Sequence, residues 1–242
     1  MATHAPFERT HPDANTIVIF THGFIGSPRQ FEDMAELAYA QGCSVLSILL
    51  PGHGGTAREF AKARLHDWEA HLESEIRRVA PAYQNVILVG HSMGGLLSLN
   101  ASLGEPKVKG VLLISSPLRL RFLPSTLRLG IKLRLFPKSR DEIWKAYRDS
   151  NSVQGISIRW LRQVADLRKL MAKTKANLPN ITAQTTVIHS QKDETVSHKS
   201  ANLFKSGLTH ANIVPLTDSR HAYYTPTERE VICKALQNLI GG

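Results

Sequence analysis

The sequence predicts an α/β fold in which a mostly parallel sheet has helices on both faces and carries a small inserted cap. Short apolar runs rich in β-branched residues recur along the 242 residues, helical patterns separate most of them, and one long stretch departs from this alternation. Strands buried on both faces of a parallel sheet have such continuous apolar runs. The six predicted strands cover residues 16–20, 44–50, 85–89, 108–115, 185–189 and 212–216.

The helical patterns begin at capping sequences. SPRQ at 27–30 and TPTE at 225–228 each have a hydroxyl residue, a proline and, three residues after the hydroxyl, Gln or Glu. This pattern is typical of a capping box with proline in the first helical turn. Apolar residues at helical spacing predict further helices around 68–79 and 161–167, and Ser197 is the expected cap of a helix that runs through 204.

The stretch from 117 to 180 interrupts the alternation. Its 64 residues exceed an ordinary connection between two strands. We therefore expect residues 1–116 and 181–242 to form the core and 117–180 to form an inserted cap or lid. Ser139 is expected to cap one helix of this cap. Apolar and polar residues alternate over 127–135, which leaves strand and helix both open there.

The net charge of +10, from 30 basic and 20 acidic residues, is concentrated in this expected cap. Residues 117–180 hold 15 Lys and Arg against 4 Asp and Glu, so the remainder is nearly neutral. No nucleic-acid-binding motif accompanies the charge, and we expect no nucleic-acid partner. Two readings stay open: a solvated surface, or a weak attraction of the basic cap to anionic lipid or substrate. The oligomeric state is not indicated.

Cysteine content and hydropathy give further expectations. Cys43 and Cys233 are the only cysteines, and no Cys/His cluster has zinc-ligand spacing. We therefore expect no disulfide, no metal site and two buried thiols in a reducing compartment. The first sixteen residues lack the apolar core of a signal peptide, and no apolar stretch approaches the length of a membrane span. These features favour a soluble cytoplasmic protein.

A nucleophile motif follows the predicted strand at 85–89. Gly90, Ser92 and Gly94 form G-x-S-x-G, and an apolar helical pattern comes directly after it. In this context a sharp turn raises the serine hydroxyl above the sheet, and only very small residues fit two positions to either side. The sequence thus predicts Ser92 as a nucleophile, with an ordinary glycine turn and an incidental serine as the alternative.

A nucleophilic serine needs a base, and the base needs an acid that orients it. His221 follows the last predicted strand, at the sheet edge where catalytic groups of α/β proteins collect, and is the expected base. Asp193 follows the strand at 185–189 and is the expected acid, with Glu194 and Asp218 as rivals. His91 adjoins the serine, but its side chain is expected to point elsewhere.

Acyl transfer also requires donors for the developing oxyanion. The backbone N–H of Met93, directly after the nucleophile, is the first expected donor. Phe24, in a His-Gly loop after the first predicted strand, is the expected second donor. The alternative is a glycine-rich turn that only connects a strand to a helix.

Several motifs occur in one order along the chain: HGFIGSP at 22–28, PGHGGT at 51–56, LHDW at 65–68, GHSMGG at 90–95, KDETVS at 192–197 and the late His221. Together they resemble the α/β-hydrolase carboxylesterases and bacterial monoacylglycerol lipases. The stretch LRKLMAKTKANLPNIT at 167–182 also resembles the end of that family's cap.

The resemblance implies an α/β-hydrolase fold and a serine carboxylic-ester hydrolase that acts on a small-molecule ester without a cofactor. It assigns Ser92 as nucleophile, Asp193 as acid and His221 as base, with the amides of Phe24 and Met93 as the oxyanion hole. The same residues can also cleave thioesters, amides or carbon–carbon bonds, and a ligand-binding protein without activity can share the fold.

Overall fold

A seven-stranded sheet organises the part of the chain that the computed structural model describes, residues 4–121, 142–153 and 160–242. The strands are β1 (Phe7–Arg9), β2 (Thr16–Thr21), β3 (Ser44–Ile48), β4 (Asn85–His91), β5 (Val108–Ile114), β6 (Gln184–Ser190) and β7 (Ala211–Leu216). They lie in the order β1-β3-β2-β4-β5-β6-β7, and all neighbours are parallel except β1 and β3. All six predicted strands are confirmed. The sequence reading missed β1, a three-residue strand without an apolar run.

Helices occupy most connections between the strands, as predicted. The α-helices are α1 (Glu32–Ala40), α2 (Ala57–Phe60), α3 (Leu65–Val79), α4 (Met93–Ala101), α6 (Glu142–Ser150), α7 (Leu161–Asn177), α8 (Lys199–Gly207) and α9 (Pro226–Gly241). The short 3-10 helices are η1 (Pro28–Phe31), η2 (Ala80–Ala82), η3 (Ser102–Gly104) and η5 (Leu178–Asn180).

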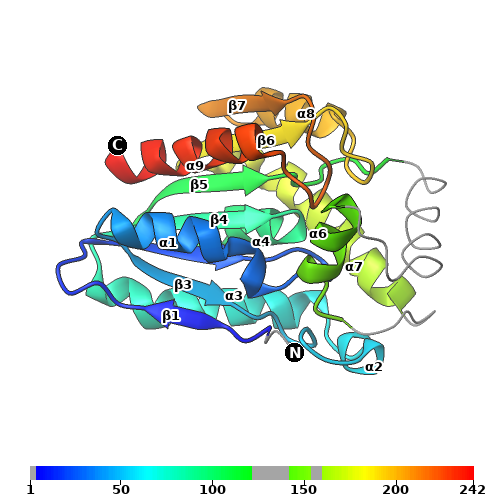
Figure 1. Ribbon diagram of the computed structural model, residues 1–242, viewed down its shortest axis with the longest axis horizontal. Coiled ribbons are helices and arrows are strands. Elements are labelled where there is room, and N and C mark those ends of the chain that lie inside the picture. Colours follow the sequence, from blue (N-terminus) through cyan, green and yellow to red (C-terminus); the bar gives the residue numbers. More distant parts are fainter. Residues whose placement is uncertain (1–3, 122–141, 154–159) are drawn as a thin grey trace.

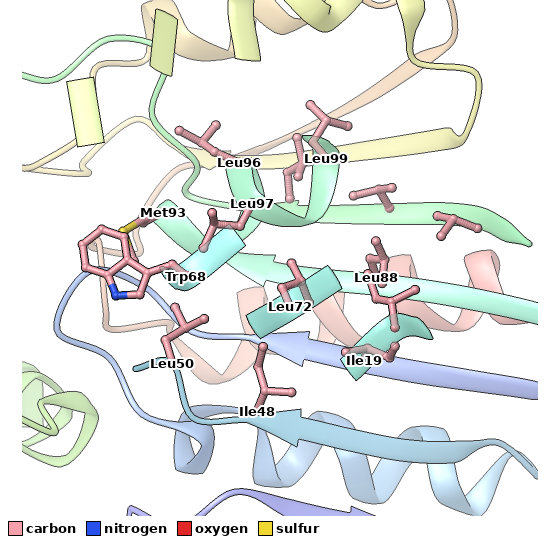
Figure 2. Close-up of a cluster of buried hydrophobic side chains, with 14 of the residues drawn as sticks. Ile19, Ile48, Leu50, Trp68, Leu72, Leu88, Met93, Leu96, Leu97 and Leu99 are labelled. Atoms are coloured by element: carbon pink, nitrogen blue, oxygen red, sulfur yellow. The ribbon is translucent and has the colours of Figure 1, made fainter. Parts of the chain in front are cut away.

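The helices form two layers, one on each face of the sheet (Figure 1). Val18 and Phe20 of β2 pack in the cluster with α1 and α9, whereas Ile17 and Ile19 pack in the cluster with α3, α4, α7 and α8. Figure 2 shows part of this second cluster, where Trp68 lies near Met93 of α4 and near Leu50, just after β3. Because each fully buried side chain of this size contributes about 1.5–3 kcal/mol, the two cores hold the strand ends in place.

Two capping sequences differ in detail from the prediction. Ser27 Oγ accepts the N–H of Arg29, at 3.3 Å, because the first turn is the 3-10 helix η1. Thr225 Oγ1 accepts the N–H of Glu228, as a capping box requires, but the Glu228 carboxylate does not return to the Thr225 amide. It accepts the amides of residues 217–219 instead and so ties α9 to the end of β7.

The connection between β5 and β6 contains α6 and α7. Helix α7 packs against α4 and α3, and Leu167 and Leu170 belong to the larger core cluster. The Arg64 guanidinium donates to both carboxylate oxygens of Asp166, at 2.6 and 3.1 Å, which joins α7 to the start of α3. The predicted helix at 161–167 is thus confirmed as part of α7. The alternating segment 127–135 and Ser139 lie outside the described residues.

The two cysteines are free thiols. Cys43 is buried as predicted, but Cys233 is only half-buried on α9, which corrects the expectation of two buried thiols. Burial raises the pKa of both. No helix within the described ranges is long and apolar enough to cross a membrane.

Candidate active site

Ser92 lies at the sharp turn between β4 and α4. Its φ and ψ of 53° and −119° are unusual for a residue with a side chain, and its amide donates to the carbonyl of Ile114 at 2.8 Å. Backbone strain of this kind costs about 1–3 kcal/mol and persists only where the surroundings enforce it. The neighbouring strand β5 and helix α4 enforce it here, and this is the geometry that the G-x-S-x-G motif predicts.

The glycines of the motif have no space for a side chain. A Cβ atom on Gly90 would lie 2.3 Å from the Cα atom of Gly95, and one on Gly94 would lie 2.0 Å from the carbonyl oxygen of Thr21. Both distances are far below van der Waals contact. Close packing of α4 on β4 and β2 therefore requires glycine at both positions.

The structure brings His221 and Asp193 to Ser92. His221, between β7 and α9, has its Nε2 atom 3.1 Å from Ser92 Oγ and its Nδ1 atom 2.9 Å from Asp193 Oδ2. Asp193 follows β6, is fully buried and accepts the amides of Thr195 and Val196 at its other oxygen. Three loops at the carboxyl ends of β4, β6 and β7 thus form one hydrogen-bonded series.

The two rival carboxylates lie elsewhere. Glu194 Oε2 accepts the backbone N–H of His221 at 3.5 Å. Asp218 is exposed and pairs with Lys192 at 2.6 Å. The direct hydrogen bond to the His221 ring therefore favours Asp193 as the acid.

The charges of this series favour an ionised carboxylate beside a basic imidazole. Burial alone would raise the pKa of Asp193, but the His221 charge, its hydrogen bond and two backbone amides lower it below the ordinary value. Burial alone would lower the pKa of His221, but the Asp193 carboxylate and, to a smaller extent, Glu194 raise it above the ordinary value. His221 is therefore a stronger base than a histidine in solution.

One expected oxyanion donor follows the serine directly, and the other lies one residue beyond a glycine that approaches the serine. Met93 begins α4, where the helix dipole favours a negative charge. Phe24 follows Gly23, and a Cβ atom added to Gly23 would lie 3.1 Å from Ser92 Cβ. Within the described residues neither amide has a hydrogen-bond acceptor. Both N–H groups are thus available to a ligand beside Ser92.

Two side chains that support His221 were not predicted. His91 Nε2 donates to the carbonyl oxygen of His221 at 2.8 Å, and Tyr224 Oη donates to the same oxygen at 3.1 Å. The prediction that His91 points elsewhere is correct for Ser92 but missed this contact. Burial lowers the pKa of His91 to about 3, so its ring is neutral and carries its proton on Nε2.

Across residues 4–121, 142–153 and 160–242, no group of three or more His, Cys, Asp or Glu side chains is arranged to hold a metal ion.

Comparisons with known proteins agree with this fold. A family model described as "Alpha/beta hydrolase family" matches residues 18–233. A thermostable monoacylglycerol lipase of Bacillus sp. (strain H-257) is 27% identical over 208 residues, which cover 84% of this chain and 82% of that protein. A solved structure of the metagenome-derived lipolytic enzymes LipS and LipT superposes with a TM-score of 0.79 at 21% identity, and covers 99% and 98% of the two chains. The monoacylglycerol lipase of Paleococcus ferrophilus superposes with a TM-score of 0.74 at 19% identity, and covers 98% and 97%.

Proposed function

Since the chain belongs to the alpha/beta hydrolase family, we propose that it is a serine carboxylic-ester hydrolase for small to medium acyl esters, of the carboxylesterase or monoacylglycerol lipase type. The observation that carries this proposal is the hydrogen-bonded series from Asp193 through His221 to Ser92, beside two amides without acceptors in the described residues. Acyl transfer needs an activated nucleophile and oxyanion donors. The similarity to a monoacylglycerol lipase also supports an ester substrate.

In the first half of the proposed reaction, His221 Nε2 takes the hydroxyl proton while Ser92 Oγ bonds to the ester carbonyl carbon. The amides of Phe24 and Met93 stabilise the resulting oxyanion, and Asp193 stabilises the imidazolium. His221 then gives the proton to the leaving alcohol oxygen as the carbon–oxygen bond breaks. An acyl ester of Ser92 remains.

In the second half, water replaces the alcohol. His221 takes a proton from the water as its oxygen bonds to the acyl carbon, and the same two amides stabilise the second oxyanion. When the bond to Ser92 Oγ breaks, His221 returns the proton to the serine. The carboxylic acid leaves, and the reaction requires no cofactor.

Residues 117–180 form the proposed cap of this enzyme. Helix α6 lies beyond the carboxyl ends of the strands (Figure 1), and Tyr223 Oη donates to Glu142 at its start, at 3.4 Å. The excess of basic residues in 117–180 supports a weak attraction to anionic lipid or substrate. Sedimentation with phosphatidylcholine vesicles that contain or lack phosphatidylserine tests it, and equal binding to both would reject it.

The substitution Ser92→Ala tests the catalytic proposal. We expect hydrolysis of p-nitrophenyl butyrate to fall to the level without enzyme, and a fluorophosphonate probe to label the wild-type chain at Ser92 only. Ser98→Ala is the control. Ser98 lies in α4, the helix that follows Ser92, and its hydroxyl is buried outside the hydrogen-bonded series. A Ser92→Ala variant that keeps most of the activity would refute the assignment.

The same residues can cleave other bonds to an acyl carbon, so the substrate class needs its own test. Matched butyryl esters, thioesters and amides, assayed at equal enzyme concentration, separate an esterase from a thioesterase or an amidase. We expect the highest kcat/KM for the ester. A wild-type chain that neither turns over any of these nor reacts with the fluorophosphonate would be a ligand-binding protein instead.

A further inference from the structure

Four carbonyls of the loop that carries the Phe24 amide accept hydrogen bonds. We call residues 22–26 the oxyanion loop. The Gly23 carbonyl accepts the His22 Nδ1 proton and the Gly26 amide, both at 2.9 Å. The Phe24 carbonyl accepts the His53 Nε2 proton at 2.7 Å. Because the Gly23 carbonyl and the Phe24 N–H belong to one planar peptide unit, holding the carbonyl also aims the N–H.

The remaining two carbonyls are held from the β5–β6 connection. Ser152 donates its backbone N–H to the Ile25 carbonyl at 3.0 Å and its hydroxyl to the Gly26 carbonyl at 2.5 Å. These residues are more than 120 positions apart in the sequence, and Ser152 is only 2% exposed. Asn151 holds the donor segment itself, because its Oδ1 atom accepts the Val153 amide at 2.9 Å. One buried serine thus joins the proposed cap to the oxyanion loop.

The position of the loop matters for the reacting atoms. The turn is tight, because a Cβ atom added to Gly26 would lie 2.8 Å from the Gly23 amide nitrogen. Gly23 in turn approaches Ser92. A change in the Gly26 peptide is therefore transmitted within one turn to the peptide unit that carries the Phe24 N–H. Oxyanion donors are effective only when they are fixed in place before the charge develops.

We propose that Ser152 is a positioning residue that aims the Phe24 amide at the oxyanion. This inference rests on the proposed esterase function. Ser152 does not contact the reacting atoms in this role; it acts through the Gly26 and Ile25 carbonyls. The proposed cap thus helps to stabilise the transition state, in addition to any contact that it makes with the substrate.

Ser152→Ala tests the proposal, with Ser47→Ala as a matched control. Ser47 is also fully buried, and its hydroxyl donates to the Pro28 carbonyl at 3.2 Å, just beyond the oxyanion loop. Complete loss of an oxyanion donor costs about 10²–10³ in kcat. In Ser152→Ala we expect the Phe24 N–H to be displaced, so that kcat falls about tenfold with less than a twofold change in KM. Ser47→Ala should keep the wild-type kcat.

A transition-state analogue supplies a readout that fold stability does not move. A trifluoromethyl ketone with a butyl chain forms an oxyanion on the serine, so its inhibition constant should rise by the same factor as kcat falls. If Ser152→Ala does not fold, Ser152→Cys, which keeps the side-chain size but has only a weak donor, takes its place. Equal kcat and inhibition constants in the Ser152 and Ser47 variants would overturn the inference. An active Ser92→Ala variant would instead overturn the esterase proposal, so the two failures are distinguishable.

Discussion

The Nε2 atom of His91 lies 2.8 Å from the carbonyl oxygen of His221, so the residue before the proposed nucleophile holds the backbone of the proposed base. Tyr224 donates to the same oxygen, and its hydroxyl lies 3.2 Å from Ser115 Oγ. The His221 ring is thereby aimed from both ends: Asp193 fixes its Nδ1 atom, and two donors fix its main chain.

Removal of one backbone donor should slow catalysis without abolishing it. In Tyr224→Phe the His221 carbonyl keeps its bond from His91, so we expect kcat for p-nitrophenyl butyrate to fall about threefold to tenfold, the equivalent of one ordinary hydrogen bond. Tyr223→Phe is the matched control, because the hydroxyl of that neighbouring tyrosine donates to Glu142 at the surface. Equal rates in the two variants would show that Tyr224 does not position His221.

The pH dependence of kcat/KM should report the raised pKa of His221. The base must be neutral to accept the Ser92 proton, so activity rises with pH through the His221 pKa, which lies above its ordinary value of about 6.5. Asp193→Asn removes the carboxylate that raises this pKa. We expect the acidic limb to move to lower pH and the plateau to fall about 10⁴-fold.

Asp218→Asn is the control for this profile. It removes an exposed carboxylate that pairs with Lys192, so both the limb and the plateau should stay in place. An acidic limb that remains at the wild-type position in Asp193→Asn would mean that another group controls the pKa of His221.

The difference between what could and could not be predicted follows from sequence distance. Ser92, Asp193 and His221 each follow a predicted strand, and the carboxyl ends of parallel strands meet at one edge, so their proximity was predictable. Asp193 was the expected acid, but its place after the strand left Glu194 and Asp218 as rivals, because the carboxylate that faces His221 depends on how the loop turns. The contact of His91 with His221 joins residues 130 positions apart, and no local pattern announces it.

The same reasoning applies to the fold. The six buried strands were predictable because an apolar run must be buried, whereas β1, with two exposed residues among its three, has no such requirement. The Thr225 cap was predictable from local chemistry. The Glu228 carboxylate was not, because the free amides of residues 217–219 lie close to it only after β7 and α9 have packed.

Alanine at the elbow glycine Gly94 should destabilise the fold as well as the site. The new methyl group would lie 2.0 Å from the Thr21 carbonyl oxygen, so β2 and α4 must separate. Overpacking of this kind costs about 1–3 kcal/mol, and each kcal/mol lowers the Tm of a domain of this size by about 2–4 °C. We therefore expect Gly94→Ala to lower Tm by about 2–12 °C in thermal unfolding and to be inactive.

Gly104→Ala is the control for that measurement, because a Cβ atom there meets nothing within 4 Å. Its Tm and kcat should match those of the wild type. Should Gly94→Ala retain the wild-type Tm and activity, the close approach of α4 to β2 would not be required by the elbow.

The ion pair between Arg64 and Asp166 should contribute stability that depends on pH. The Asp166 side chain is 3% exposed, and its hydrogen bond from Arg64 lowers its pKa below the ordinary value of about 3.9. A carboxyl group with a lowered pKa stabilises the fold above its ordinary pKa, and this stability is lost as the pH falls through the folded-state pKa. Asp166→Asn should therefore lower Tm by about 5 °C at pH 7, since it leaves Arg64 without its charged partner, and by less at pH 3.

Lys173→Met, which removes the exposed partner of Glu69, should change Tm by no more than about 2 °C at either pH. If the Tm difference between wild type and Asp166→Asn is the same at pH 3 and pH 7, ionisation of Asp166 does not contribute to the attachment of α7.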